Sequence, residues 1–382
     1  MTDETLVVIG SGPAGITAAR AYREAGGRGR VRVVSADPDP PYARPPLSKD
    51  FLRGESGEPD LALDDPGPDV ELVLGDPVAE LGEHEIRTES GVFRPFTRCV
   101  LATGAEPVRP PIPGADHPDV CCLRSLTSSR ELRAAAGAAR SAVVVGAGFI
   151  GCEAAVSLSR LGVQVTMLCP DSVPQRQRLG RDAGELILHW LKSEGVSVLR
   201  ETPLDAVTEG HRVHTGLVSA LDTDLILLAT GVRPRVELAE KAGLTVENGR
   251  VRTDQRLRTS RPDVYAAGDI ALAYNPPAGR ALAVEHWGEG LAMGEVAGRS
   301  AAGAETVWDA VPGFWSEIGD HVLKYAAWGD GFDDARPVSV DGGFTVWYER
   351  RGTALGVLTY NADEDYERGT ELIREHRPIP LL

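Results

Sequence analysis

The sequence predicts an α/β protein with two parallel-sheet domains and a smaller α+β region toward its C-terminal end. Three observations lead to this fold class. A chain of 382 residues is too long for one ordinary core. An apolar strand, a glycine-rich turn and a helical pattern follow one another twice, as they do in βαβ units. From about residue 306 short apolar runs alternate with polar residues instead, which indicates strands.

Composition and charge narrow the class of protein. With 42% hydrophobic and 25% charged residues, the chain has the composition of a soluble globular protein. A polar MTDET leads directly into an apolar strand, so we expect no signal peptide. No apolar run reaches the roughly 18 to 20 residues that span a bilayer. The net charge of −16 argues against nucleic acid and anionic membranes as partners. We expect a cytoplasmic protein, either a monomer or a homodimer.

The cysteines predict neither a disulfide framework nor a metal site. None of them forms a CxxC motif or a metal-ligand spacing, and an odd, scattered set is typical of reduced thiols. A bond between the two adjacent cysteines would require strained geometry. The five positions are Cys99, Cys121, Cys122, Cys152 and Cys169.

The first strand-turn-helix copy begins with the apolar run at residues 6–9. A GxGxxG turn and a helical pattern follow it. The glycines let the backbone approach a pyrophosphate, whose charge the helix N-terminus favours. A second strand ends near Asp37, about 20 residues after the turn, where a carboxylate binds a ribose. The candidate residues of the turn are Gly10, Gly12, Pro13, Ala14 and Gly15.

The second copy repeats this order of elements. The apolar run at residues 142–145 leads into another GxGxxG turn, a helical pattern and the strand VQVTML. One such hexapeptide is a weak signal, but two complete copies predict two bound dinucleotides. The candidate residues are Gly146, Gly148, Phe149, Ile150 and Gly151.

Each copy has a later counterpart. The stretches VLATGAEP (100–107) and LLATGVRP (227–234) are apolar strands that break at Thr-Gly. They are either simple strand ends or, as we prefer beside two nucleotide motifs, the points where the chain changes domain. A third stretch, VYAAGDIA, places a Gly-Asp pair after a short strand. The candidate residues are Ala102, Thr103, Gly104, Gly231, Gly268 and Asp269.

In this order, the five motifs resemble those of the FAD-dependent pyridine nucleotide-disulfide oxidoreductase superfamily. The resemblance covers about residues 5–300 and implies two Rossmann-like domains, which bind FAD and then NADH or NADPH. It implies that Asp269 binds the flavin ribityl chain. The expected FAD domain is discontinuous, and an NAD(P) domain and a C-terminal α+β domain complete the chain. The expected bounds are 1–108 with 233–305, 109–232 and 306–382.

The stretch YARPPLSKDFLRG separates this chain from the disulfide reductases. Those members carry redox cysteines in this place, whereas here proline fixes the backbone and no cysteine lies nearby. The stretch resembles the ferredoxin reductase subgroup, such as putidaredoxin reductase, in which this loop packs beside the isoalloxazine. The resemblance places Arg44, Pro45 and Lys49 near the flavin and makes the flavin the terminal redox centre. A purely structural loop is the alternative.

Two tryptophan motifs resemble the same subgroup. VEHW (284–287) and GFWSEIGD (313–320) imply a flavin contact, with core packing as the alternative for each tryptophan. The usual Asp-Gln after FWS is replaced by Glu317-Ile318, which leaves the partner-facing surface open. The residues implied are Glu285, His286, Trp287 and Trp315.

The catalytic pair implied by the resemblance is Lys49 and Glu153. In related enzymes this glutamate contacts the nicotinamide carboxamide and pairs with the lysine near flavin N5. A buried carboxylate needs such a cation, although a glutamate that stabilises a helix N-terminus is the alternative. Phe149 is the implied aromatic gate over the flavin.

The nicotinamide nucleotide stays undecided between NADH and NADPH. The strand that should end in an acid ends at Cys169, and Asp171 follows two residues later. Arg176 and Arg178 lie within reach of a 2′-phosphate. An acid binds the free 2′-hydroxyl, whereas an arginine favours NADPH.

The predicted reaction is hydride transfer from NAD(P)H to flavin N5, followed by electron delivery to a ferredoxin-type iron–sulfur protein of an oxygenase or P450. Arg350 and Arg351 are candidate docking residues in an acidic C-terminal region. One alternative is a reductase of a small acceptor such as a quinone, disulfide or peroxide. Another is a redox-sensing flavoprotein like apoptosis-inducing factor.

Overall fold

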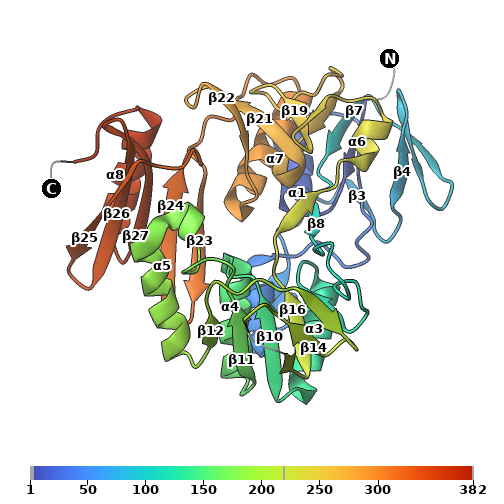
Figure 1. The fold of residues 1–382 in the computed structure, drawn as a ribbon. Helices are drawn as coiled ribbons and strands as arrows, with labels where there is room; N and C mark the ends of the chain where they lie inside the picture. The colour runs from blue at the N-terminus through green and yellow to red at the C-terminus, as the bar shows by residue number, and fades with distance from the viewer. Residues whose placement is uncertain (1–3, 218–219, 381–382) are drawn as a thin grey trace. The chain divides into compact units, whose positions relative to one another are not determined.

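The computed structural model describes residues 4–217 and 220–380. They form two compact units, each built from three separate stretches of chain (Figure 1). Unit 1 contains the chain up to Ala43 together with Ala62–Glu106 and Arg233–Gly313. Unit 2 contains Arg44–Leu61, Pro107–Val232 and the chain from Phe314 onward.

Unit 1 is built on a five-stranded parallel sheet of order β20-β7-β1-β2-β3. Its central strand, β1, is almost entirely apolar and buried, as expected for a parallel sheet covered on both faces. The strands are Val264–Ala266, Arg98–Leu101, Thr5–Ile9, Arg30–Val34 and Val70–Val73.

Two helices of unit 1, α1 (Pro13–Glu24) and α7 (Trp287–Ala301), pack closely against each other. Glycines make this approach possible. A Cβ added at Gly294 would lie 2.4 Å from the Ala14 carbonyl oxygen, and one at Gly298 would lie 2.2 Å from that of Ala18. Helix α7 is therefore fixed against the helix that follows the first glycine turn.

The remainder of unit 1 consists of smaller elements. A meander contains β4 to β6, and a four-stranded sheet has the order β18-β19-β21-β22. Their bounds, with those of helix α6 and the 3₁₀ turn η3, are Val78–Leu81, Glu85–Thr88, Phe93–Pro95, Val246–Glu247, Arg250–Thr253, Ala271–Asn275, Arg280–Ala283, Glu237–Lys241 and Gly268–Ile270. The chain passes between the units at β8 (Ala105–Pro107) and β17 (Val232–Pro234), which pair as a ribbon.

Unit 2 contains the second parallel sheet, of order β12-β11-β10-β16-β9. Its strands are Ser197–Leu199, Gln164–Leu168, Ser141–Val145, Leu225–Leu228 and Val120–Cys122. The helices are α3 (Leu126–Ala138), α4 (Phe149–Arg160) and α5 (Arg176–Ser193), the last broken at Gly180. A small sheet joins Ala206–Thr208, Arg212–His214 and Leu221–Asp222.

The C-terminal part of unit 2 is a five-stranded sheet of order β23-β24-β27-β26-β25, in which the last four strands pair antiparallel. The strands are Gly313–Ile318, His321–Ala327, Thr353–Tyr360, Gly343–Arg350 and Asp334–Val340. The sequence predicted a small α+β domain here. Within residues 306–380 the structure has one helix, α8 (Asp363–Arg374), which packs on β27.

The proline-rich stretch, predicted to be a rigid loop, forms short helical turns. Pro45–Ser48 form the 3₁₀ turn η1 and Asp50–Arg53 the single-turn helix α2, with a further 3₁₀ turn, η2, at Glu58–Leu61. Two prolines fit at the start of η1 because a first helical turn needs no N–H donor there.

The predicted α/β fold class, with two Rossmann-like sheets and a small C-terminal α+β part, is confirmed. The division into three functional domains stays a prediction. No helix within residues 4–217 and 220–380 is long and apolar enough to cross a bilayer.

Candidate active site

The first glycine turn is a backbone cradle that side chains would fill. Gly10 has φ +111°, and a Cβ there would lie 2.2 Å from the Ala102 carbonyl oxygen. A Cβ at Gly15 would lie 1.9 Å from the Gly10 carbonyl oxygen. Gly12 is the N-cap of α1 and Pro13 its first residue, so the open N–H groups of the first turn face the loop. This geometry fits a pyrophosphate.

The second glycine turn repeats the same geometry in unit 2. Gly146 has φ +104°, and its Cβ would lie 2.4 Å from the Ala229 carbonyl oxygen. The Cβ of an alanine at position 151 would lie 2.3 Å from the Gly146 carbonyl oxygen. Gly148 is the N-cap of α4. The two turns are thus equivalent in structure as well as in sequence.

The carboxylate predicted to bind a ribose lies just beyond β2. Asp37 accepts hydrogen bonds from the Tyr42 hydroxyl at 2.7 Å and from the Asp39 N–H at 3.2 Å. It is half-buried, and a carboxylate with two such donors keeps acceptor capacity for ribose hydroxyls. Nearby, the Ser11 hydroxyl donates to Ser35 Oγ at 2.8 Å. Tyr42 and Ser35 were not among the sequence candidates.

The Gly-Asp turn meets the start of α1. Gly268 has φ +76°, and a Cβ there would lie 3.1 Å from Ala14 Cβ. Asp269 follows in η3, and its backbone oxygen accepts a hydrogen bond from Arg250. Unit 1 therefore brings the first glycine turn and the predicted ribityl-binding residue together.

Glu285 has a partner that sequence reasoning missed. Its carboxylate pairs with the Arg250 guanidinium, which also holds the backbone at Asp269. His286 is the N-cap of α7 and Trp287 its first residue, both half-buried. Arg250 thus links the VEHW motif to the Gly-Asp turn. No spacing rule predicts this link, because 35 residues separate the two charges.

The Thr-Gly turn of unit 1 is also ordered by hydrogen bonds. The Thr103 hydroxyl donates to the Arg235 carbonyl oxygen at 2.8 Å, and the Arg235 N–H donates to the Gly104 oxygen at 2.9 Å. Ala102 is buried against Gly10. In the corresponding stretch LLATGVRP of the second copy, Gly231 has φ +97°.

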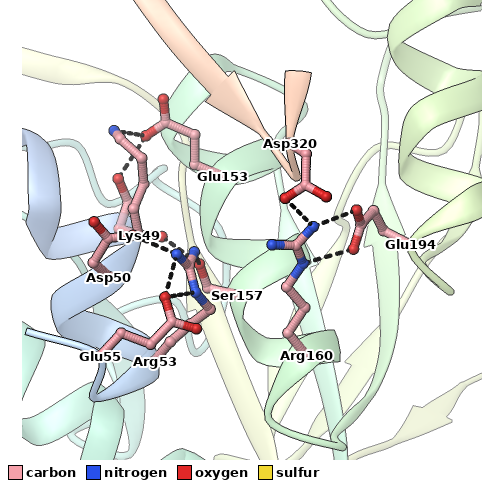
Figure 2. A network of polar contacts seen from close by, with 10 residues as sticks. Lys49, Asp50, Arg53, Glu55, Glu153, Ser157, Arg160, Glu194 and Asp320 are labelled. Atoms are coloured by element: carbon pink, nitrogen blue, oxygen red, sulfur yellow. Dashed lines mark hydrogen bonds and ion pairs between the residues drawn. The ribbon is translucent and has the colours of Figure 1, made fainter. Parts of the chain in front are cut away.

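Lys49 and Glu153 form a buried ion pair in unit 2 (Figure 2). Lys49 Nζ lies 2.9 Å from Glu153 Oε2, and the two residues are 7% and 6% exposed. The Ser48 hydroxyl donates to the same oxygen at 2.6 Å. Glu153 lies beyond the first turn of α4, so its contacts rather than the helix dipole account for its position.

The second oxygen of Glu153 binds the C-terminal sheet. Ser316 Oγ donates to Oε1 at 2.7 Å, and the Glu317 N–H does so at 3.3 Å. Three stretches that are distant in sequence therefore meet at one carboxylate: η1, α4 and β23. Ser48 and Ser316 were not predicted from the sequence, since no motif connects residues more than 100 positions apart.

The stretch that carries Lys49 is held firmly on α3 and α4. The Ser157 hydroxyl donates to the Ser48 carbonyl oxygen at 2.7 Å, and that of Ser129 donates to the Leu47 oxygen at 2.8 Å. Arg44 donates to the Arg124 carbonyl oxygen at 3.0 Å. Pro45 opens the 3₁₀ turn between these anchors.

Aromatic groups surround the start of α4. The ring of Phe149 packs edge-on against Phe314, with centroids 4.7 Å apart, and the Arg178 guanidinium carbon lies 5.7 Å from the Phe314 centroid. Ile150 and Trp315 are 40% and 41% exposed. Core packing therefore does not explain Trp315.

Comparison with known proteins identifies the family. Residues 4–294 match the model of the pyridine nucleotide-disulphide oxidoreductase family. The chain belongs to this family. It is an NAD(P)H-dependent flavoprotein oxidoreductase whose cofactors are FAD and a nicotinamide nucleotide, as the sequence predicted. The two glycine cradles fit these dinucleotides. An added Cβ at either turn would collide with backbone atoms, and turns without side chains let the backbone approach a pyrophosphate.

Curated relatives within the family are reductases of small electron-transfer proteins. The chain is 32% identical over 329 residues to the rubredoxin-NAD(+) reductase of Ectopseudomonas oleovorans, covering 84% of this chain and 85% of that protein. It is 34% identical over 330 residues to the biphenyl dioxygenase system ferredoxin--NAD(+) reductase component of Paraburkholderia xenovorans, covering 84% and 80%.

Solved structures give the same result. The ferredoxin reductase for the CYP199A2 system from Rhodopseudomonas palustris has a TM-score of 0.92 at 26% identity, over 99% of this chain and 96% of that one. The reductase in a covalent putidaredoxin reductase–putidaredoxin complex has a TM-score of 0.90 at 25% identity, over 99% and 94%.

The cysteines of this family member are not activated. All five are free thiols. Burial raises the pKa of Cys99 and Cys152 well above the ordinary value, and it raises the pKa of Cys169 to about 11. Burial also raises the pKa of Cys121 and Cys122. Because the thiolate is the reactive form, none of them is poised for thiol chemistry at neutral pH.

The segment after β11, which bears on the choice between NADH and NADPH, contains both acidic and basic side chains. Cys169 is buried, and its thiol donates to the Asp171 carbonyl oxygen at 3.2 Å. The Asp171 carboxylate accepts from Gln177 Nε2 at 3.5 Å, while Arg176 and Arg178 are exposed. One acid and two arginines thus follow the strand, a combination compatible with NADH and with NADPH.

Proposed function

We propose that this oxidoreductase passes electrons from NAD(P)H by way of FAD to a small iron–sulfur protein of the ferredoxin class, which serves an oxygenase or P450. The proposal includes a cytoplasmic location and a monomer or homodimer. The observation that carries it is the buried Lys49–Glu153 pair. Lys49 belongs to the stretch YARPPLSKDFLRG, which contains no cysteine and which, by the resemblance, corresponds to the segment with the redox cysteines in disulfide-reducing members. The names of the relatives and the putidaredoxin complex support the acceptor.

The first cradle would hold the FAD pyrophosphate on the backbone of Gly10, Gly12 and Gly15. Asp37 would accept hydrogen bonds from the ribose and Asp269 from the ribityl chain. The bound flavin supplies a ring that accepts a hydride and releases electrons. The second cradle, at Gly146, Gly148 and Gly151, would hold NAD(P)H.

The side chains contribute orientation and charge. The Glu153 carboxylate would accept a hydrogen bond from the nicotinamide carboxamide and so orient the nicotinamide for hydride transfer. Lys49 provides a positive charge, which a low-dielectric site makes effective against developing negative charge. Phe149 covers the reaction site until the nicotinamide arrives. Lys49, Glu153, Ser48 and Ser316 are buried, so the ion pair itself is shielded from water.

The hydride step should not depend on any thiol. We expect a variant with Cys99 and Cys152 changed to Ala, and the three other cysteines to Ser, to keep flavin reduction within about threefold of wild type. Alanine suits Cys99 and Cys152 because a buried hydroxyl without a partner is unfavourable, whereas a serine at the buried Cys169 can keep the bond to the Asp171 carbonyl oxygen. Stopped-flow absorbance with NADH and with NADPH measures the rate and identifies the preferred nucleotide. Lost reduction in a folded, flavin-loaded variant would indicate thiol chemistry.

Two arginines at the turn between β26 and β27 allow the identity of the electron acceptor to be tested. Arg351 stands there with φ +52°, beside Arg350, whose Nε lies 3.8 Å from an Asp333 oxygen. Ferredoxins are acidic, so this basic pair is a candidate contact on an acidic chain. Changing both to Glu should slow ferredoxin-coupled cytochrome c reduction roughly tenfold, an effect that salt reduces, and leave flavin reduction unchanged.

The matched control changes the same number of charges on α8, through Arg368→Glu and Arg374→Glu, and should retain coupling. An equal slowing in both double variants would mean that net charge alone acts. If free quinone or ferricyanide supports faster turnover than any ferredoxin, the acceptor is a small molecule and the proposal is wrong.

A further inference from the structure

The Glu153 carboxylate has no acceptor position left. A carboxylate offers about four lone-pair sites, and four donors occupy them. Ser48 Oγ and Lys49 Nζ donate to Oε2, whereas Ser316 Oγ and the Glu317 N–H donate to Oε1. A further donor can bind Glu153 only if one of these leaves.

The two oxygens differ in how firmly they are held. Oε2 is bound by an ammonium group at 2.9 Å and a short hydroxyl contact at 2.6 Å, and charge-assisted bonds are the stronger kind. Oε1 is bound by two neutral donors, of which the Glu317 N–H is long at 3.3 Å. The exchangeable side of Glu153 is therefore Oε1, and both of its donors belong to β23.

Strand β23 and its neighbour β24 form a hairpin, which is also attached to the far end of α4. The Arg160 guanidinium binds Asp320 at 3.0 Å, in the turn after β23, and binds both oxygens of Glu194 at 2.6 and 2.8 Å (Figure 2). Glu153 and Arg160 are seven positions apart, about 10 Å along a helix. The hairpin is thus joined to α4 at two points. The contact at Glu153 Oε1 is exchangeable, whereas the contact at Arg160 is made of three charged groups.

We propose that nicotinamide nucleotide binding releases β23 from Glu153, because the carboxamide N–H takes the place of Ser316 and Glu317 at Oε1. This inference rests on the proposed function, in which Glu153 receives the carboxamide. The Arg160–Asp320 contact stays and keeps the hairpin attached. Strand β23, which carries the exposed Trp315, thereby reports nucleotide occupancy to the C-terminal sheet. By linkage, anything that holds β23 in place weakens nucleotide binding by the same factor.

The test measures affinity for NAD⁺ and NADP⁺ by titration of the FAD-loaded protein. In Ser316→Ala the nucleotide no longer competes with the hydroxyl, so we expect binding about fivefold tighter than wild type, the size of one ordinary hydrogen bond. Ser316→Thr keeps the hydroxyl and should bind like wild type. Ser300→Ala is the matched control, since Ser300 is also a buried serine but lies in α7 of unit 1. It should also bind like wild type.

Wild-type protein gives a second readout that needs no variant. Hydrogen exchange of the β23 amide at Glu317 should accelerate at least threefold when NAD⁺ or NADP⁺ saturates the site. Two results would overturn this inference alone, provided that NAD(P)H still reduces the flavin. One is nucleotide binding by Ser316→Ala that is unchanged or weaker than wild type, and the other is slower exchange at the Glu317 amide. If wild-type protein binds no nicotinamide nucleotide and none reduces its flavin, the inference and the proposed function both fail.

Discussion

Flavin reduction by NAD(P)H should slow about 100-fold or more when Glu153 is replaced by leucine. The substitution removes the proposed acceptor for the carboxamide and leaves the ammonium group of Lys49, a residue 7% exposed, without its carboxylate. Without this acceptor the nicotinamide ring loses its fixed orientation, and misplacing a reacting group by about 1 Å can slow a reaction roughly 100-fold. Stopped-flow absorbance of the oxidised flavin under anaerobic conditions measures this rate.

Two further variants distinguish charge from shape. Glu153→Gln keeps the volume and several hydrogen bonds but loses the charge, so its rate should lie between those of wild type and leucine. Glu55→Gln removes an exposed carboxylate that pairs with Arg53 and should leave the rate unchanged, since surface pairs contribute little. A folded, flavin-loaded leucine variant reduced within threefold of wild type would remove Glu153 from the hydride step.

The pair should also behave as a unit. Lys49→Met alone leaves the Glu153 carboxylate buried with neutral donors, which is unfavourable because a buried charge without an opposite charge is destabilising. The double variant Lys49→Met with Glu153→Leu contains no unpaired charge, so its loss of stability should be smaller than the sum of the two single losses. Urea denaturation of the FAD-loaded proteins measures this coupling. Strict additivity would mean that the two charges do not interact.

Local features of the fold could be predicted from the sequence. The two glycine turns were recognised because steric rules act over a few residues: Gly10 and Gly146 need positive φ, and Gly15 and Gly151 need the absence of a Cβ. The strands before the turns and the helices after them follow from apolar runs of suitable length. The resemblance then identified Lys49 and Glu153, which no spacing rule connects.

Contacts between distant segments could not be predicted. Ser316 reaches Glu153 across 163 positions, and Arg250 reaches Glu285 across 35. Serine and arginine are common surface residues, so composition gives no signal for either. The prolines at positions 45 and 46 were interpreted as a rigid loop, although proline also suits the first positions of a helical turn. Such choices depend on tertiary contacts, here on α3 and α4.

The two cradles should be separable by one matched pair of substitutions. Gly15→Ala places a Cβ 1.9 Å from the Gly10 carbonyl oxygen, and Gly151→Ala places one 2.3 Å from that of Gly146. Both distances are far below van der Waals contact, and the obstructing atoms are backbone, so each turn must change shape. The first variant should be isolated colourless, with FAD occupancy lowered at least tenfold. The second should stay yellow but require at least 100-fold more NAD(P)H for flavin reduction.

The contrast between these variants, rather than either loss alone, tests which nucleotide each unit binds. Gly137→Ala is the control, because that glycine lies in α3 with nothing within 4 Å of an added Cβ and alanine favours a helix. It should keep both colour and rate. Absorbance at the flavin band gives occupancy, and saturation of stopped-flow reduction gives nucleotide affinity. A yellow Gly15→Ala protein with normal FAD content would mean that the first cradle does not hold the flavin nucleotide. A Gly151→Ala protein that saturates with NAD(P)H like wild type would exclude the second cradle as the nicotinamide site, because its backbone cannot keep its shape around the added methyl group.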